Sequence, residues 1–163
     1  MTFILHALFV GVFATGFMDI VALVQKRFMG IPALNYAMVG RWIGHIRHGQ
    51  IIHRPIGKSP PIPNEAVLGW AAHYLTGVLF AATLLFLSRP EWAQSPGLAW
   101  PVIFGVATVA APFLVLQPGM GAGLAARKTP TPWVARLRSV SAHFAFGIGL
   151  WLGAWLWVAV GGS

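Results

Sequence analysis

Four long apolar runs alternate with shorter polar connections along the chain. The runs cover about residues 2–25, 66–88, 98–117 and 139–160. Each is long enough to cross a bilayer, and only a segment that satisfies its own backbone hydrogen bonds can face lipid. The pattern therefore predicts an all-α fold, an integral membrane bundle of four transmembrane helices that forms one domain over residues 1–163.

The first connection, residues 26–65, contains a further amphipathic pattern. Leu34, Met38, Trp42 and Ile46 recur every four residues, whereas Arg41, His45 and His48 occupy the other positions. This spacing is typical of a short helix that lies in the membrane interface. We interpret it as a basic anchor attracted to anionic lipid headgroups.

Three positions in the sequence indicate where a helix begins or bends. Asn64 is a suitable N-cap for the second span. Thr131 can cap a helix with Pro132 at its first position, so the fourth helix is expected to begin before its apolar run. Pro112 lacks the N–H that would bond the carbonyl of Thr108, so a kink is predicted near Thr108.

Composition narrows the class of protein. Hydrophobic residues make up 57% of the chain and charged residues 9%, against about 25% charged in ordinary soluble domains. The net charge of +8 resides in the connections between apolar runs, so we expect no nucleic-acid partner. The chain has no cysteine, which excludes disulfides and thiolate ligands. The first run has no basic segment before it and no clear cleavage site, so it is expected to be retained.

The basic residues also predict an orientation. Six Lys and Arg side chains lie in residues 26–65 and four in residues 118–138, whereas the remaining connection carries only Arg89. Loops rich in Lys and Arg stay in the cytoplasm. The two basic loops are therefore predicted to be cytoplasmic and both termini periplasmic. The outer interface is expected to hold Trp92, Trp100, Trp151, Trp155 and Trp157, and the inner one Trp42, Trp70 and Trp133.

Three ionisable side chains inside the predicted spans are candidates for a functional site: Asp19, His73 and His143. Their offsets from the flanking charged residues place them roughly 8 to 12 Å below the cytoplasmic surface. Each lies on a stripe of small residues spaced by four, which is typical of close helix packing. These stripes are Gly11, Thr15, Asp19; Gly69, His73, Gly77; and His143, Gly147. The pattern favours convergence of the three side chains in one site.

Three interpretations of this cluster stay open. It is a polar cluster that only holds helices together, a proton-relay or transport site, or a metal or haem ligand set. One carboxylate and two imidazoles suit zinc or non-haem iron, and two imidazoles alone suit a haem. The loop histidines His45, His48 and His53 are weaker metal candidates, and we interpret them as solvated.

A glycine-rich corner, residues 117–123, follows the third span. Gly119, Gly121 and Gly123 make its backbone permissive, and Arg127 and Lys128 lie close by in the sequence. Exposed amides beside basic side chains can receive an anion, and we favour a lipid headgroup as that anion. The alternative is a flexible exit turn. The segment lacks the strand and the Gly-Lys-Ser/Thr ending of a nucleotide-binding loop, which excludes nucleotides.

Several segments together resemble a known family. They are residues 16–19 (GFMD), 34–45 (LNYAMVGRWIGH), 69–74 (GWAAHY), 117–123 (QPGMGAG) and 143–147 (HFAFG). The chain resembles an uncharacterised bacterial membrane family, domain of unknown function 2938. The resemblance implies a small protein of the bacterial inner membrane, and it brings no activity, substrate or catalytic residue.

The leading functional prediction is transport or binding of a small ligand or proton at a cytoplasm-facing polar site built from Asp19, His73 and His143. The alternatives are a metal- or haem-binding redox or enzyme subunit and a purely structural accessory subunit. No serine, histidine and carboxylate arrangement typical of a hydrolase is recognisable, so a non-enzyme is favoured. The partners expected are the bilayer and its anionic headgroups. Self-association or membership of a larger membrane complex stays open.

Overall fold

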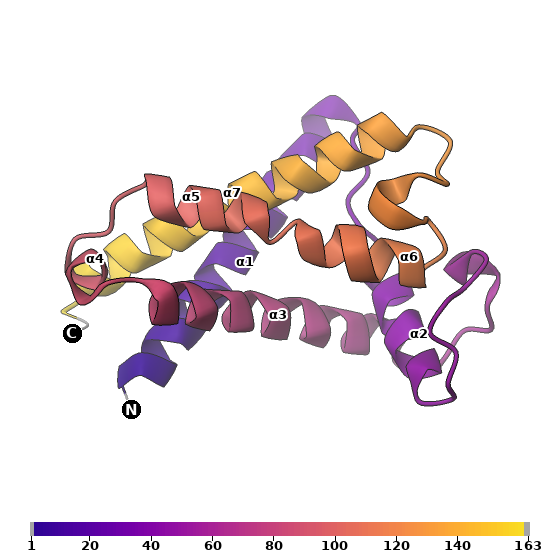
Figure 1. Ribbon diagram of the computed structural model, residues 1–163, viewed down its shortest axis with the longest axis horizontal. Helices are drawn as coiled ribbons and strands as arrows, with labels where there is room; N and C mark the ends of the chain where they lie inside the picture. The colour runs from indigo at the N-terminus through magenta and orange to yellow at the C-terminus, as the bar shows by residue number, and fades with distance from the viewer. Residues whose placement is uncertain (1, 162–163) are drawn as a thin grey trace. The chain divides into compact units, whose positions relative to one another are not determined.

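Helix is the only regular secondary structure in the part of the chain that the structure describes. The computed structural model describes residues 2–161, in which 75% of the chain is helix and no strand occurs. The elements in chain order are α1 (Thr2–Met29), α2 (Tyr36–Ile46), η1 (Ile56–Lys58), α3 (Glu65–Leu87), α4 (Pro90–Gln94), α5 (Ala99–Ala107), η2 (Pro112–Leu116), α6 (Gln117–Gly119), η3 (Leu124–Ala126) and α7 (Pro132–Ala159) (Figure 1). The all-α fold predicted from the sequence is confirmed.

Four helical segments of the described chain are long and apolar enough to cross a membrane. They are Phe3–Met29, Glu65–Leu87, Ala99–Gly119 and Pro132–Ala159. The predicted four spans are therefore confirmed, with shifts at their ends. The fourth helix begins at Pro132, well before its apolar run, and the Thr131 carbonyl accepts a 3.1 Å bond from the Ala135 N–H. This geometry is the helix start expected from the Thr131-Pro132 pair.

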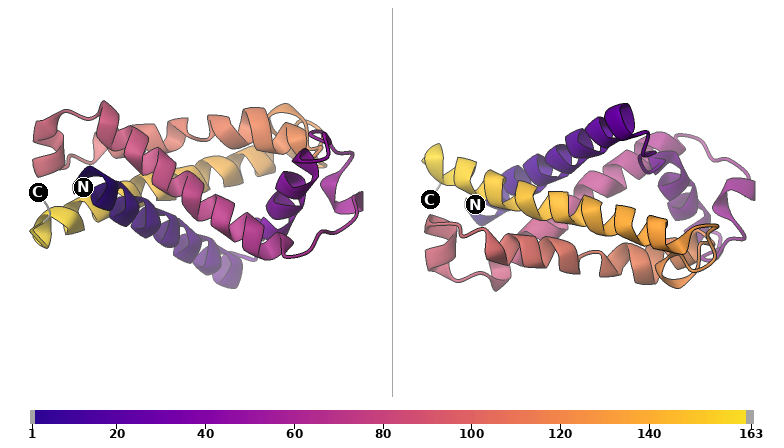
Figure 2. Two further views of the ribbon diagram at one scale, coloured as in Figure 1. Left: turned by 90° about the horizontal axis from the view of Figure 1, so that it is seen from below. Right: turned by 90° about the horizontal axis from the view of Figure 1, so that it is seen from above.

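The third span is not one regular helix. Helix α5 ends at Ala107, a turn covers residues 108 and 109, and η2 is a π-helix that begins at Pro112. The interruption lies where the sequence predicts a kink, because Pro112 has no N–H for the Thr108 carbonyl. Figure 2 shows the contrast with α3 and α7, which are unbroken.

The chain forms two compact units. Unit 1 contains residues 2–33, 74–108 and 141–161 of the described chain, and unit 2 contains 34–73 and 109–140. The core of unit 1 is apolar and made by α1, α3 and α7. Its buried members are Val10, Ala14, Ala81, Leu84, Phe146, Leu150 and Ala154.

Small residues let the helices of unit 1 approach closely. A Cβ added to Gly11 of α1 would lie 2.5 Å from the Cα of Val78 in α3. One added to Gly149 of α7 would lie 2.8 Å from the Cα of Ala14 in α1. The contact at Gly11 is the close helix packing expected for that member of the predicted stripe of α1.

In unit 2, α2 packs against the first turns of α3 through two glycines. A Cβ on Gly40 would meet the Glu65 carbonyl oxygen, and one on Gly69 would meet the carbonyl oxygen of Tyr36. Helix α2 starts after Asn35, whose side chain accepts a 3.1 Å bond from the Ala37 N–H. The short helix expected within residues 26–65 is therefore observed, starting two residues after Leu34.

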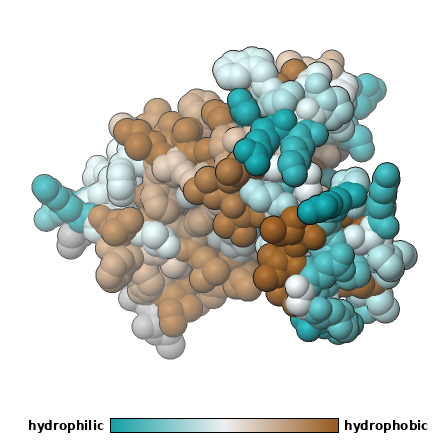
Figure 3. All heavy atoms as spheres, turned by 45° about the vertical axis from the view of Figure 1, so that its right-hand side comes forward, coloured by the Kyte–Doolittle hydropathy of each residue, from teal (hydrophilic) through white to brown (hydrophobic). Residues whose placement is uncertain are grey.

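Large apolar side chains cover much of the surface. Phe86 is 80% exposed, Leu23 64% and Ile4 64%, and all three lie on helices able to cross a membrane. Figure 3 shows a face on which apolar residues form broad patches and polar residues gather in clusters. A water-soluble protein rarely exposes apolar area of this extent, whereas a lipid-facing surface requires it.

Candidate functional site

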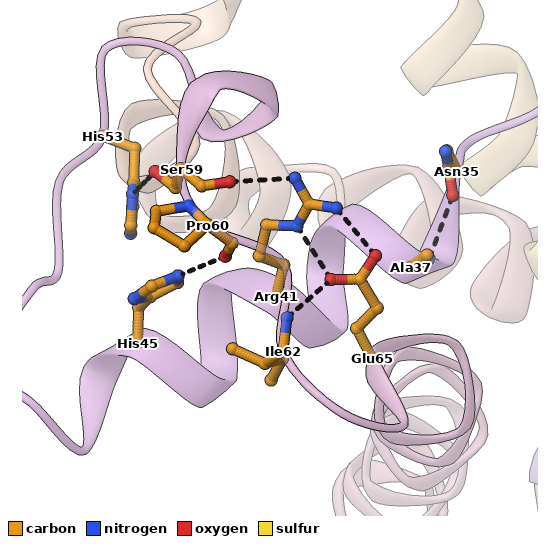
Figure 4. A network of polar contacts seen from close by, with 9 residues as sticks. All are labelled: Asn35, Ala37, Arg41, His45, His53, Ser59, Pro60, Ile62 and Glu65. Atoms are coloured by element: carbon orange, nitrogen blue, oxygen red, sulfur yellow. Dashed lines mark hydrogen bonds and ion pairs between the residues drawn. The ribbon is translucent and has the colours of Figure 1, made fainter.

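A network of polar contacts among the described residues is centred on Arg41 of α2, in unit 2 (Figure 4). Its guanidinium donates two 2.8 Å bonds to the two carboxylate oxygens of Glu65, the first residue of α3. A third nitrogen, Nη1, donates to the Ser59 carbonyl at 3.1 Å. The Glu65 carboxylate also accepts a 3.2 Å bond from the Ile62 N–H. The network fixes the 59–65 segment against α2.

This pair changes the interpretation of Arg41. The sequence places Arg41 on the polar face of a lipid anchor, but in the structure only 11% of its side chain is exposed, and 18% of that of Glu65. The fork geometry is the one in which Arg binds a carboxylate most specifically. Donation of these hydrogen bonds to the Glu65 carboxylate raises the pKa of Arg41 above its ordinary value. The charge of Arg41 is therefore paired with a carboxylate within the protein.

Two histidines extend the network on the far side of Ser59 and Pro60. His45 Nε2 donates to the Pro60 carbonyl at 2.9 Å, and His53 Nδ1 lies 2.6 Å from the Ser59 hydroxyl oxygen. His53 is only 2% exposed, so it is not the solvated loop histidine that the sequence suggested. The segment of His53 is held against the glycine-rich corner, because the backbone N–H of His53 donates to the Gly119 carbonyl at 2.9 Å. His48, by contrast, is exposed.

The glycine-rich corner packs against this histidine segment. A Cβ on Gly119 would lie 2.5 Å from the indole nitrogen of Trp42, and one on Gly121 would lie 2.5 Å from the His53 carbonyl oxygen. Gly121 also has a φ of 93°, which favours glycine. The Gly121 and Ala122 amides donate to carbonyls within the corner at 3.0 and 2.8 Å. These glycines thus serve packing, and those two amides are already used.

Gly123 and its basic neighbours make a second part of the corner. Gly123 has a φ of 74°, and a Cβ there would lie 2.9 Å from the Arg127 stem and 3.0 Å from that of Lys128. Both charged residues follow η3 directly and are exposed. Anion binding by this group stays a prediction.

Two of the three intramembrane candidates lie in unit 1, and each is bonded to a hydroxyl group. Asp19 Oδ2 of α1 accepts a 3.1 Å bond from the Tyr74 hydroxyl of α3. His143 Nδ1 of α7 lies 2.7 Å from Thr108 Oγ1, and that hydroxyl donates its one hydrogen to the Gly105 carbonyl. The imidazole of His143 is thus hydrogen-bonded to a hydroxyl group on the neighbouring helical segment.

His73 belongs to unit 2 and lies among aromatic rings. Its ring stacks on that of Tyr36 with centroids 4.2 Å apart, and it meets Trp70 edge-on at 5.8 Å. The predicted convergence of His73 with Asp19 and His143 involves both units, so it stays a prediction.

The described part of the chain contains no group of three or more His, Asp or Glu side chains that could hold a metal ion. His45, His48 and His53 therefore do not form such a group, although the rings of His45 and His53 lie 5.3 Å apart. A metal or haem role for Asp19 and His143 rests on the sequence pattern alone.

Three partners were not singled out from the sequence: Glu65 for Arg41, Tyr74 for Asp19 and Thr108 for His143. A signal existed for Tyr74, because it is one of two tyrosines in the chain and lies within a predicted span. No spacing rule links Arg41 to Glu65, since the pair joins two helices across a folded loop.

Fold and composition together define the class: the protein is an all-helical membrane protein with four helices able to span the bilayer. Within that class, the chain belongs to the family described as "Protein of unknown function (DUF2938)", which it matches over residues 8–157. The resemblance seen in the sequence motifs is confirmed. No curated protein and no solved structure matches the chain.

Proposed function

We propose that this protein binds or relays a proton or a small ligand through ionisable side chains inside its spans. The observation that supports this proposal most is the Asp19 carboxylate of α1, which accepts a hydrogen bond from the Tyr74 phenol in apolar helices. Ionisable groups at membrane depth are costly and commonly line the path of a proton or substrate. His143, whose Nδ1 lies 2.7 Å from the Thr108 hydroxyl oxygen, supplies a second such group in unit 1.

The chemistry of these groups suits proton exchange better than covalent catalysis. A carboxylate accepts a proton, a phenol orients it, and an imidazole can both bind and release one near neutral pH. The sequence provides no thiol, and no hydrolase triad is recognisable in it. A carrier or binding protein fits this set of side chains better than an enzyme.

The proposed location is the bacterial inner membrane, with the site open toward the cytoplasm. The distribution of Lys and Arg supports this orientation, because ten of the eleven basic side chains lie in the two connections predicted to be cytoplasmic. The family resemblance supports the bacterial origin.

Asp19→Asn is expected to abolish proton or ligand movement while the protein still folds, because the amide keeps the size of the side chain but cannot ionise. The measurement is pH-gradient decay in proteoliposomes that contain the purified protein. Thr83→Val is the matched control, since the Thr83 hydroxyl bonds its own helix at the Leu79 carbonyl. Equal decay in wild type and Asp19→Asn, above that of empty liposomes, would exclude Asp19 from the path.

A structural role is the second candidate, favoured by the fact that the hydrogen bonds of Asp19 and His143 join different helices. Tyr74 links α3 to α1, and His143 links α7 to the end of α5. Interhelical bonds of this kind contribute about 0.6 kcal/mol on average in a membrane. Under this alternative, Asp19→Asn lowers the thermal midpoint in detergent slightly, and the wild-type protein causes no flux.

The proposed orientation predicts a periplasmic C-terminus. A reporter that works only in the periplasm is expected to be active when it is fused after the last residue. A reporter that works only in the cytoplasm is expected to be inactive at the same position. A fusion within residues 118–138 should give the reverse pattern and serves as the internal control. A cytoplasmic signal from the C-terminal fusion would reverse the assigned orientation.

A further inference from the structure

Unit 2 has a groove between α2 and the start of α3. Its volume is about 460 Å³, and it is lined by Ile43, Gly44, Arg47, Ile62, Pro63 and Leu68. Gly44 is buried, and a Cβ there would meet the end of the Ile62 side chain, so the Ile62 side chain packs directly over this glycine.

The lining combines one cation with aliphatic side chains. Arg47 is the charged member and is exposed, whereas Ile43, Ile62 and Leu68 are half-buried. Arg47 Nε donates a 3.1 Å bond to His48 Nε2, a ring nitrogen that accepts only while it is unprotonated. A ligand that fits this lining has an anionic end and an apolar body.

The charge balance of unit 2 favours an anionic ligand. Residues 34–73 and 109–140 contain eight Lys and Arg side chains and one carboxylate, that of Glu65. Figure 4 shows this carboxylate directed at Arg41, to which it is bonded through both oxygens. Arg47 thus has no carboxylate of its own unit to bind.

The position of the groove along the chain points to the headgroup level of a bilayer. Ile62 and Pro63 directly precede α3, a helix able to cross a membrane from Glu65 to Leu87. A residue at the end of such a helix lies near the polar boundary of the hydrocarbon region. An Arg at this depth is within reach of lipid phosphates.

We propose that this groove binds an anionic phospholipid, whose phosphate is bonded by Arg47 and whose acyl chain covers Ile43, Ile62 and Leu68. The source of the phosphate is a lipid and not a free ion, because the aliphatic lining contributes only when an apolar chain is attached. The groove shares no residue with Asp19 or His143. The lipid-binding proposal and the proposed function can therefore be tested separately.

The test is native mass spectrometry of the detergent-solubilised full chain, titrated with phosphatidylglycerol or with zwitterionic phosphatidylcholine. Wild type is expected to retain phosphatidylglycerol preferentially. Arg47→Gln is expected to weaken that binding roughly fivefold to tenfold, since a charge-assisted bond is lost. Arg54→Gln is the matched control, an exposed arginine of the same unit that does not line the groove.

A second variant tests the apolar part of the site. Ile43→Asn is expected to weaken phosphatidylglycerol binding, whereas glycerol phosphate alone should bind neither wild type nor variant measurably. If Arg47→Gln and Arg54→Gln weaken phosphatidylglycerol binding equally, the lipid is attracted by general charge and the proposed groove site is wrong. Binding unchanged by both Arg47→Gln and Ile43→Asn would overturn it as well.

Discussion

Gly69→Ala is expected to disrupt the packing of α2 on α3, because the new methyl group would occupy the place of the Tyr36 carbonyl oxygen. The Tyr36 carbonyl carbon would lie 2.6 Å and the Gly40 nitrogen 3.0 Å from the same Cβ, so all neighbours are backbone atoms that cannot turn away. Overpacking of this kind costs about 2–3 kcal/mol. The measurement is the thermal unfolding midpoint in detergent, together with the rate of proteolysis within residues 47–64.

The control for this variant is Gly57→Ala, at a position of unit 2 where an added Cβ has nothing within 4 Å. It should leave both the midpoint and the proteolysis rate close to wild type. If Gly69→Ala behaves like Gly57→Ala, the close approach of α2 and α3 is not required for stability.

Gly105→Ala is expected to have an effect of similar size in unit 1. A Cβ on Gly105 would lie 2.5 Å from the Cα of Gly147 and 2.9 Å from the carbonyl oxygen of His143, so α5 and α7 must separate to accept it. We expect a loss of about 2–3 kcal/mol from overpacking. Because the Gly105 carbonyl accepts the Thr108 hydroxyl, the variant should also disturb the bond between Thr108 and His143.

This second effect is measured separately from stability, by the nitrogen chemical shifts of the His143 imidazole in labelled protein. Gly16→Ala provides the comparison, since its Cβ would make only an ordinary contact, 3.8 Å from the Tyr74 hydroxyl oxygen. A normal midpoint and unchanged His143 shifts in Gly105→Ala would contradict the packing described for α5 and α7.

Much of the fold is predictable because a membrane restricts the chain to few solutions. Long apolar runs must be helices where they face lipid, so the four spans follow from hydropathy. The interruption of the third span is also predictable, because the missing N–H of Pro112 is a local property of the sequence. The C-terminal extension of α1 to Met29 is different, because residues 26–29 are no longer continuously apolar and a helix there has no hydropathy signal.

The candidate site was less predictable because its contacts are tertiary. Depth along a helix can be counted from the sequence, so Asp19 and His143 were found as intramembrane groups. Their hydroxyl partners Tyr74 and Thr108 depend on which helix faces which, and periodicity does not specify that. The glycines at 119 and 121 signalled a special backbone, but flexibility, anion binding and close packing all produce that signal.

The crossing of α2 and α3 has a further consequence for the forces that hold it. Where a Cβ would collide with the Tyr36 and Glu65 carbonyl oxygens, Gly69 and Gly40 each direct an α-hydrogen at those oxygens. The crossing is thus a reciprocal pair of Cα–H···O contacts, worth about 0.5–1 kcal/mol each. Such contacts use no polar side chain, so they act in addition to the Arg41–Glu65 ion pair that joins the same two helices.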